Sequence, residues 1–134
     1  MTTAQQRALL RNMFDAAVAA VSPNRSLAEH LPEAPRGRTI VVGAGKGAAA
    51  MALSLEQNWR GPLEGMVVTR YDHGLPTTRI KVVEAAHPVP DEAGEGAARE
   101  ILALAGALGP DDLLLVLVSG GGSSLLSLPA EGIA

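Results

Sequence analysis

Apolar residues follow two different spacings along the chain, and these predict helices that alternate with strands. In residues 9–21 they recur on one helical face, which predicts an amphipathic first helix ending near Ser22 and Pro23. We expect this helix to dock on the domain or on a partner subunit, as in a homodimer. Residues 26–29 match a capping box and predict a short second helix that Pro32 ends.

Four short runs of aliphatic and β-branched residues predict strands at residues 39–42, 65–69, 80–84 and 113–118. A helical pattern follows the first strand, and another lies between the third and fourth, where Asp91 can cap it. A polar loop alone joins the second and third strands. This alternation predicts a three-layer α/β/α Rossmann-like domain with a mostly parallel sheet.

Polar or glycine-rich loops leave the carboxyl ends of all four predicted strands. They begin at Gly43, Arg70, His87 and Ser119. Because parallel strands end at the same edge of a sheet, we expect these loops to meet where such sheets bind their ligands. The most apolar run of the chain leads into the last loop, which predicts that this loop follows a buried core strand and is not a linker.

The last loop, residues 119–124, has a composition that favours anion binding. Glycines let backbone N–H groups approach a ligand, and serine hydroxyls add further donors. A helix that begins after the loop would add a partial positive charge. The phosphate-binding candidates in this loop are Ser119, Gly120, Gly121, Gly122, Ser123 and Ser124.

The first loop, residues 43–48, is open to two interpretations. Its sequence Gly-Ala-Gly-Lys-Gly-Ala matches the G-x-G-x-x-G/A pattern of dinucleotide sites. The second strand ends without an acid to hold a ribose 2′-hydroxyl, although Arg70 could meet a 2′-phosphate. Alternatively, Lys46 is a cation at the start of a helix that favours a nearby anion, which Gly43 and Gly45 let approach.

Composition excludes several kinds of function. The net charge is −3 without a basic stripe, and Phe14, Trp59 and Tyr71 are the only aromatic residues, which argues against nucleic-acid binding. The absence of cysteine removes disulfides and thiolate catalysis. No apolar run approaches membrane-spanning length, and the N-terminus does not resemble a signal peptide. We therefore expect a cytoplasmic protein that binds neither nucleic acid nor membranes.

Individual side chains add little further chemistry. No group of His, Asp and Glu has metal-ligand spacing, and the serines do not form a nucleophile elbow. His87 precedes a proline and could orient its loop or act as an acid or base. Asp91 is a weaker site candidate, because a helix cap explains it as well.

Four motifs resemble the N-terminal domain of the glycerate 2-kinase family, also called MOFRL-type, some of whose members are named hydroxypyruvate reductase. They lie at residues 41–51, 68–74, 86–92 and 118–126 and occur in the family's order. Members of that family are longer and have a second domain across a cleft. The resemblance therefore implies that residues 1–134 are a truncated N-terminal domain, incomplete at the C-terminus, that is inactive alone.

The resemblance also implies an activity, namely phosphoryl transfer from ATP to the 2-hydroxyl of D-glycerate, giving 2-phosphoglycerate, with Mg²⁺. Lys46 matches the family's active-site lysine, and residues 119–124 match its anion-binding loop. Arg70, His87 and Asp91 lie in family motifs at the same edge. The general base and most Mg²⁺ ligands are expected outside this chain.

Two alternatives remain open on the sequence. One is an NAD(P)H-dependent hydroxypyruvate reductase, which rests on the glycine pattern and the family name. The other is a non-catalytic phosphosugar-binding domain, because residues 119–124 also resemble the loop of sugar-isomerase-type domains.

Overall fold

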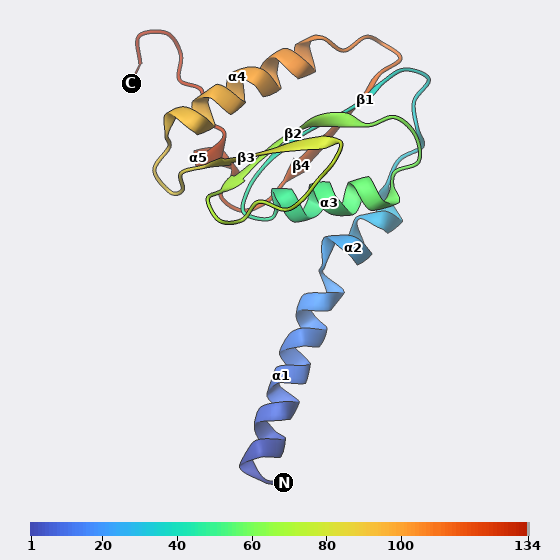
Figure 1. The fold of residues 1–134 in the computed structure, drawn as a ribbon, viewed down its shortest axis with the longest axis vertical. Helices are drawn as coiled ribbons and strands as arrows, with labels where there is room; N and C mark the ends of the chain where they lie inside the picture. Colours follow the sequence, from blue (N-terminus) through green and yellow to red (C-terminus); the bar gives the residue numbers. More distant parts are fainter. Residues whose placement is uncertain (134) are drawn as a thin grey trace.

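The computed structural model describes residues 1–133, and in them a wholly parallel sheet lies between helices on its two faces (Figure 1). The strands stand in the order β3-β2-β1-β4. They are β1(Thr39–Ala44), β2(Glu64–Arg70), β3(Ile80–Ala85) and β4(Leu113–Val118). The helix α3(Ala48–Asn58) covers one face and α4(Glu92–Gly106) the other. The predicted α/β/α class is confirmed.

Two apolar cores lie on the two sides of the central strand β1. Its residues Ile40, Val42 and Ala44 pack into the core under α4, together with Met66, Val68, Ala97 and Ile101. Val41 points the other way and packs with Ala48, Ala52, Leu55 and Trp59 of the α3 side. A strand that is buried on both faces needs apolar residues at every position, which explains the unbroken run in β1.

The prediction that residues 113–118 form a buried core strand is wrong. Within residues 1–133, β4 pairs only with β1 and forms an edge of the sheet. Val116 and Val118 are 57% and 65% exposed, although Leu117 on the opposite face is buried. A continuous apolar run indicates a strand that suits burial on both faces, but the order of the sheet decides whether both faces are covered.

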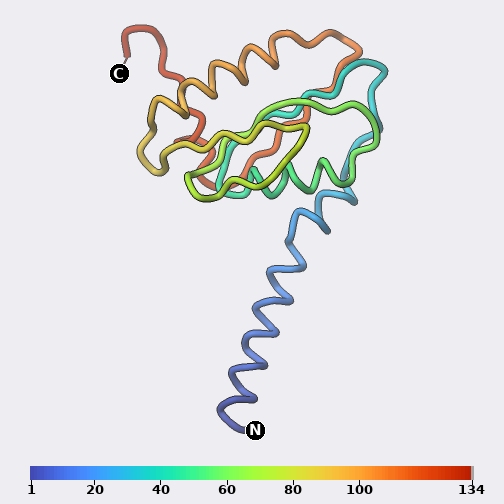
Figure 2. Tube along the Cα trace, viewed as in Figure 1, coloured from blue at the N-terminus to red at the C-terminus, as the bar shows by residue number. Residues whose placement is uncertain are grey.

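The N-terminal helix α1(Thr3–Ala20) projects away from the sheet, and the tube in Figure 2 places the N-terminus at its far tip. A capping box between Thr2 and Gln5 begins the helix. All of its residues are exposed, so the expected docking on the domain is wrong. Among residues 1–133, no helix combines the length and apolarity needed to cross a bilayer.

The predicted capping box at residues 26–29 is also wrong. The short helix α2(Pro23–Ser26) lies one turn earlier, and a 3-10 turn, η1(Ala28–His30), follows it. Proline is favoured at the first position of a helix because its fixed φ suits the helix and its missing N–H needs no partner there. Pro23 therefore begins this helix, and Ser26 ends it.

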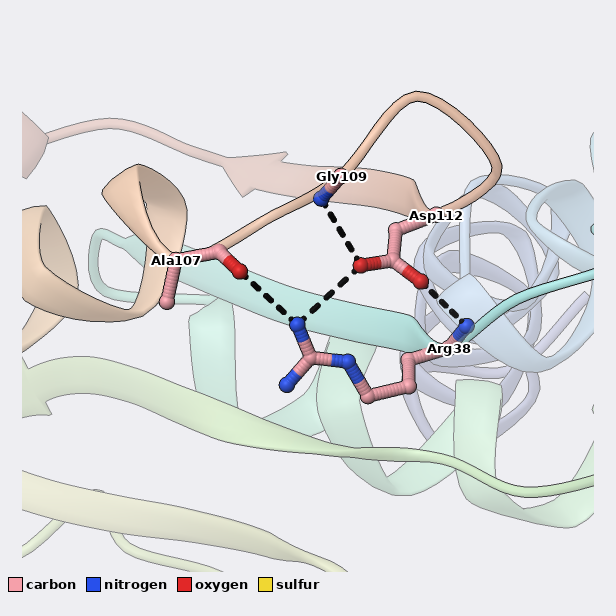
Figure 3. A network of polar contacts seen from close by, with 4 residues as sticks. All are labelled: Arg38, Ala107, Gly109 and Asp112. Carbon is pink, nitrogen blue, oxygen red and sulfur yellow. Dashed lines mark hydrogen bonds and ion pairs between the residues drawn. The ribbon is translucent and has the colours of Figure 1, made fainter.

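A polar network joins the amino ends of β1 and β4 (Figure 3). The Asp112 carboxylate accepts from the Arg38 N–H at 2.6 Å and from the Gly109 N–H at 2.9 Å. The Arg38 guanidinium donates to Asp112 and to the Ala107 carbonyl. The N–H groups of Gly109 and Arg38 hold the pKa of Asp112 below its ordinary value. The network joins these two strands at their amino ends, opposite the carboxyl ends where the predicted loops lie.

Glu56 of α3 holds the loop that returns the chain from β2 to β3. Its carboxylate accepts from the N–H groups of Thr78 (2.9 Å), Arg79 (2.6 Å) and Ile80 (2.7 Å). Burial by itself would raise the pKa of Glu56, but these three donors outweigh it and lower the pKa. One carboxylate thus positions the loop that lets β2 and β3 pair in parallel without a helix between them.

Candidate anion-binding site at the carboxyl edge of the sheet

The loops after β1 and β4 form one unit, because these strands are neighbours and end at the same edge. The Ser119 N–H donates to the Ala44 carbonyl at 3.1 Å. Three consecutive N–H groups of the first loop are also paired: Gly45 with the Val68 carbonyl (3.0 Å), Lys46 with the Gly120 carbonyl (2.9 Å) and Gly47 with Ser119 Oγ (2.9 Å).

These pairings bear on the dinucleotide interpretation. In dinucleotide sites the N–H groups of the glycine turn and of the following helix bind the pyrophosphate. Here the Ala48 N–H is paired too, with the Gly45 carbonyl at 3.1 Å. The donors of residues 45–48 are therefore used within the protein, whereas the N–H groups of Ala49 and Ala50 in the first turn of α3 have no partner among the described residues.

The glycines of the first loop serve close packing. Gly43 lies inside β1, where a Cβ atom would be 2.2 Å from the Leu117 carbonyl oxygen. Gly45 has a φ of 137°, and a Cβ there would be 2.2 Å from Ser119 Oγ. Both positions exclude a side chain because the neighbouring strand and its loop occupy the space.

The second loop, in contrast, has free backbone donors. Within residues 1–133 the N–H groups of Gly120, Gly121, Ser123 and Ser124 have no hydrogen-bond partner. The helix that follows, α5(Gly122–Leu125), is only one turn long, so it contributes little of the expected helix-dipole charge. The capacity of this loop for an anion comes from its N–H groups and the exposed Ser123.

Lys46 lies across this second loop. Its Cε is 3.7 Å from the position of a Cβ on Gly120, and its Cγ is 3.5 Å from that of a Cβ on Gly121. The side chain is exposed, and among the first 133 residues its ammonium group has neither a hydrogen bond nor an ion pair. An uncompensated cation thus stands beside free N–H groups, an arrangement that favours an anion.

His87, from the loop after β3, reaches the same place. A Cβ on Gly121 would be 2.6 Å from Nε2 of the His87 imidazole. The structure therefore brings together Lys46, His87 and the loop around Gly121, which come from three separate parts of the sequence. His87 is partly buried here.

Arg70 lies at the same edge at the end of β2, and its own loop holds it. Its Nε donates to Nδ1 of His73 at 3.1 Å. Glu84 on β3 fixes this loop by accepting from the N–H groups of His73 (3.0 Å) and Gly74 (2.7 Å). No sequence pattern marks the role of Glu84, because its partners belong to another element.

Asp91 is the cap of α4, as predicted. Its carboxylate accepts from the Gly94 N–H at 3.0 Å and from the Tyr71 hydroxyl at 2.8 Å. These two donors lower the pKa of Asp91, and the same bond to Asp91 raises the pKa of Tyr71. Both carboxylate oxygens have partners, so Asp91 caps α4 and also joins the loop after β3 to the loop after β2.

The family resemblance implied magnesium, most of whose ligands were expected outside this chain. In the part of the chain that the structure describes, no three His, Asp or Glu side chains gather in a way that could hold a metal ion.

Comparison with known proteins identifies relatives of the whole domain. Residues 9–134 match the family described as "Domain of unknown function (DUF4147)". A protein of Agrobacterium vitis provisionally named hydroxypyruvate reductase is 54% identical over 124 residues, covering 92% of this chain and 28% of the relative. The D-glycerate 2-kinase of Thermotoga maritima is 41% identical over 119 residues, covering 87% of this chain and 28% of that enzyme.

Solved structures agree with these matches. The crystal structure of glycerate kinase from Thermotoga maritima superposes with a TM-score of 0.85 at 37% identity, over 97% of this chain and 32% of that one. A protein of Pyrococcus horikoshii superposes with a TM-score of 0.81 at 32% identity, over 96% and 32% of the two chains. The chain therefore spans about a third or less of the relatives' length. It belongs to the DUF4147 family, and its relatives include proteins named glycerate 2-kinase and proteins provisionally named hydroxypyruvate reductase.

Proposed function

We propose that this chain is the phosphate-binding N-terminal domain of a glycerate 2-kinase. The full-length protein transfers the γ-phosphoryl group of ATP to the 2-hydroxyl of D-glycerate. The observation that carries the proposal is the position of Lys46 across a loop with four N–H groups, all of them, like the lysine ammonium, without a partner in residues 1–133. The choice of D-glycerate as the substrate is supported by the names of the glycerate kinases among its relatives.

The chemistry requires little beyond positioning and charge neutralisation. The 2-hydroxyl oxygen of glycerate forms a bond to the γ-phosphorus, and the bond from that phosphorus to the β–γ bridging oxygen breaks. The products are 2-phosphoglycerate, ADP and the proton of the hydroxyl group. Negative charge on the transferring group is stabilised by the Lys46 ammonium, while the N–H groups of Gly120, Gly121, Ser123 and Ser124 hold phosphate oxygens.

The remaining parts of the active site are proposed to lie in a second domain, which faces this edge of the sheet. The relatives supply the support, because they are about three times as long as the matched region. Arg70 and His87 line the near wall of the cleft and are proposed to contact anionic substrate groups. No step described here depends on the ion.

The reductase alternative is less well supported. Relatives in Agrobacterium vitis carry that name provisionally. However, the N–H groups of the glycine turn at residues 45–48 are bonded within the protein, which among the described residues leaves those of Ala49 and Ala50 in the first turn of α3 for a pyrophosphate. A non-catalytic phosphosugar-binding domain would need the same anion loop but no lysine positioned across it.

The test compares the only two lysines of the chain in the full-length protein. Lys46→Ala is expected to lower kcat for ATP-dependent phosphorylation of D-glycerate by about 10²- to 10³-fold, the range for a lost transition-state charge contact. Lys81→Ala is the matched control, because Lys81 pairs with Glu100 on α4 away from the site, and it should leave turnover unchanged. Undiminished turnover in Lys46→Ala, or NADH oxidation by hydroxypyruvate without glycerate phosphorylation, would overturn the proposal.

A further inference from the structure

The turn that carries Lys46 has no regular secondary structure, so side-chain and backbone contacts must hold it. The Gly45 N–H is fixed by β2, through the Val68 carbonyl. The next two N–H groups are fixed by the loop after β4. They are the Lys46 N–H, which donates to the Gly120 carbonyl, and the Gly47 N–H, which donates to Ser119 Oγ. The backbone around Lys46 is therefore held between β2 and the loop after β4, which lie on opposite sides of β1.

Two side-chain hydroxyls bond to this turn: Thr69 Oγ1 donates to the Lys46 carbonyl at 3.5 Å, and Ser119 Oγ accepts the shorter bond from the Gly47 N–H. Ser119 Oγ lies 2.9 Å from the Gly47 nitrogen. It fills space left by two glycines, since a Cβ on Gly45 would be 2.2 Å away and a Cβ on Gly47 would be 3.4 Å away. The hydroxyl thus sits between the two residues that flank Lys46.

We propose that Ser119 is a positioning residue for Lys46, because its hydroxyl oxygen fixes the turn and so keeps the ammonium group over residues 120–124. This inference rests on the proposed function of Lys46 and adds a role for Ser119 that acts through it. The competing role is direct contact between the Ser119 hydroxyl and a phosphate group. The two roles differ in whether the effect of Ser119 depends on Lys46.

Kinetics of the full-length protein separate the two roles. Ser119→Ala is expected to lower kcat by about 10- to 100-fold, the effect of misplacing a catalytic group, with little change in KM for ATP or D-glycerate. In a Lys46→Ala background, Ser119→Ala should change kcat by less than about twofold, because residues that act as a unit are not additive. Ser127→Ala, a serine outside the site that bonds only to the α5 backbone, is the control.

Two kinetic outcomes would overturn the proposal. One is a raised KM for ATP with unchanged kcat in Ser119→Ala, which indicates a direct phosphate contact. The other is an equal fold-loss whether or not Lys46 is present. Ser119→Thr keeps the acceptor oxygen and should recover most of the lost kcat, so a threonine variant as slow as the alanine variant would also contradict the role.

A measurement without substrate keeps the inference separate from the proposed function. Residue-resolved amide exchange in the full-length protein should show faster exchange of the Gly47 N–H in Ser119→Ala than in Ser127→Ala. Unchanged protection of Gly47 would show that the hydroxyl does not hold the turn. If the wild-type protein failed to phosphorylate glycerate, the proposed function would fall, while the exchange result would still decide whether Ser119 fixes the turn.

Discussion

The imidazole of His87 lies directly against the backbone of Gly121: a Cβ atom on Gly121 would be 2.6 Å from Nε2 of His87. Gly121 also has a φ of 89°, a conformation that favours glycine. The contact joins the loop after β3 to the loop after β4, although β3 and β4 lie at opposite edges of the sheet. The candidate site is therefore built from loops that are far apart in the sequence.

Gly121→Ala should disturb this contact and the loop together. The left-handed conformation costs a non-glycine residue about 1–2 kcal/mol, and the new methyl group must displace His87. We expect lower thermal stability and at least a tenfold loss of kcat in the full-length protein. Gly96→Ala is the control, because that helical glycine has open space around it and should gain about 0.5–1 kcal/mol. Normal turnover in Gly121→Ala would show that the close contact is dispensable.

Glu56→Ala should be among the most destabilising single changes on the α3 face. It leaves the N–H groups of Thr78, Arg79 and Ile80 without their acceptor. Bonds to a charged group contribute about 1.5–3 kcal/mol each and are not additive here, so we expect a total loss of about 3 kcal/mol. Urea denaturation measures this loss, with the exposed neighbour Gln57→Ala as control. A loss no larger than that of the control would contradict the role of Glu56.

The same carboxylate predicts how stability depends on pH. The pKa of Glu56 is lower in the folded state than in the unfolded chain, so the unfolded state binds more protons as the pH falls. The contribution is complete above about pH 4.3, the ordinary value for glutamate, and is lost as the pH falls through the lower folded value. Glu56→Gln should therefore reduce the slope of unfolding free energy against pH below pH ~4.3. An unchanged slope would show that other groups cause the loss of stability in acid.

Substitutions of Asp91 test whether this carboxylate only caps α4 or also takes part in the reaction. Asparagine caps helices about as well as aspartate, whereas alanine loses about 1 kcal/mol. Because both Asp91 oxygens already have partners, Asp91→Asn should keep kcat/KM for glycerate phosphorylation within about twofold, a loss under 0.5 kcal/mol. Asp91→Ala should lower the melting temperature. A tenfold drop in kcat with asparagine would instead place the carboxylate in the reaction.

The 134-residue chain alone should not turn over. It supplies only the proposed near wall of the cleft, so neither substrate would be enclosed. Glycerate-dependent ATP consumption by the isolated chain, measured beside the full-length protein, is expected to stay at background. Substantial turnover would contradict the proposed second domain.

Much of the architecture follows from local sequence. The apolar spacing located all four strands and the helices α1, α3 and α4, and Asp91 was found as a cap. These features depend on residues close in the chain, whose periodicity and capping chemistry are visible without a partner. The four glycine-rich and polar motifs likewise identified the family.

Tertiary structure alone decided how those pieces work together. Whether β4 is buried depends on its place in the sheet. The apolar spacing of α1 likewise could not show that all residues of this helix are exposed. The bond between Gly47 and Ser119 joins residues 72 positions apart and exists only because β1 and β4 are neighbours. Local sequence shows which backbone donors a loop contains, but only the packing of distant strands determines which of them remain free for a ligand.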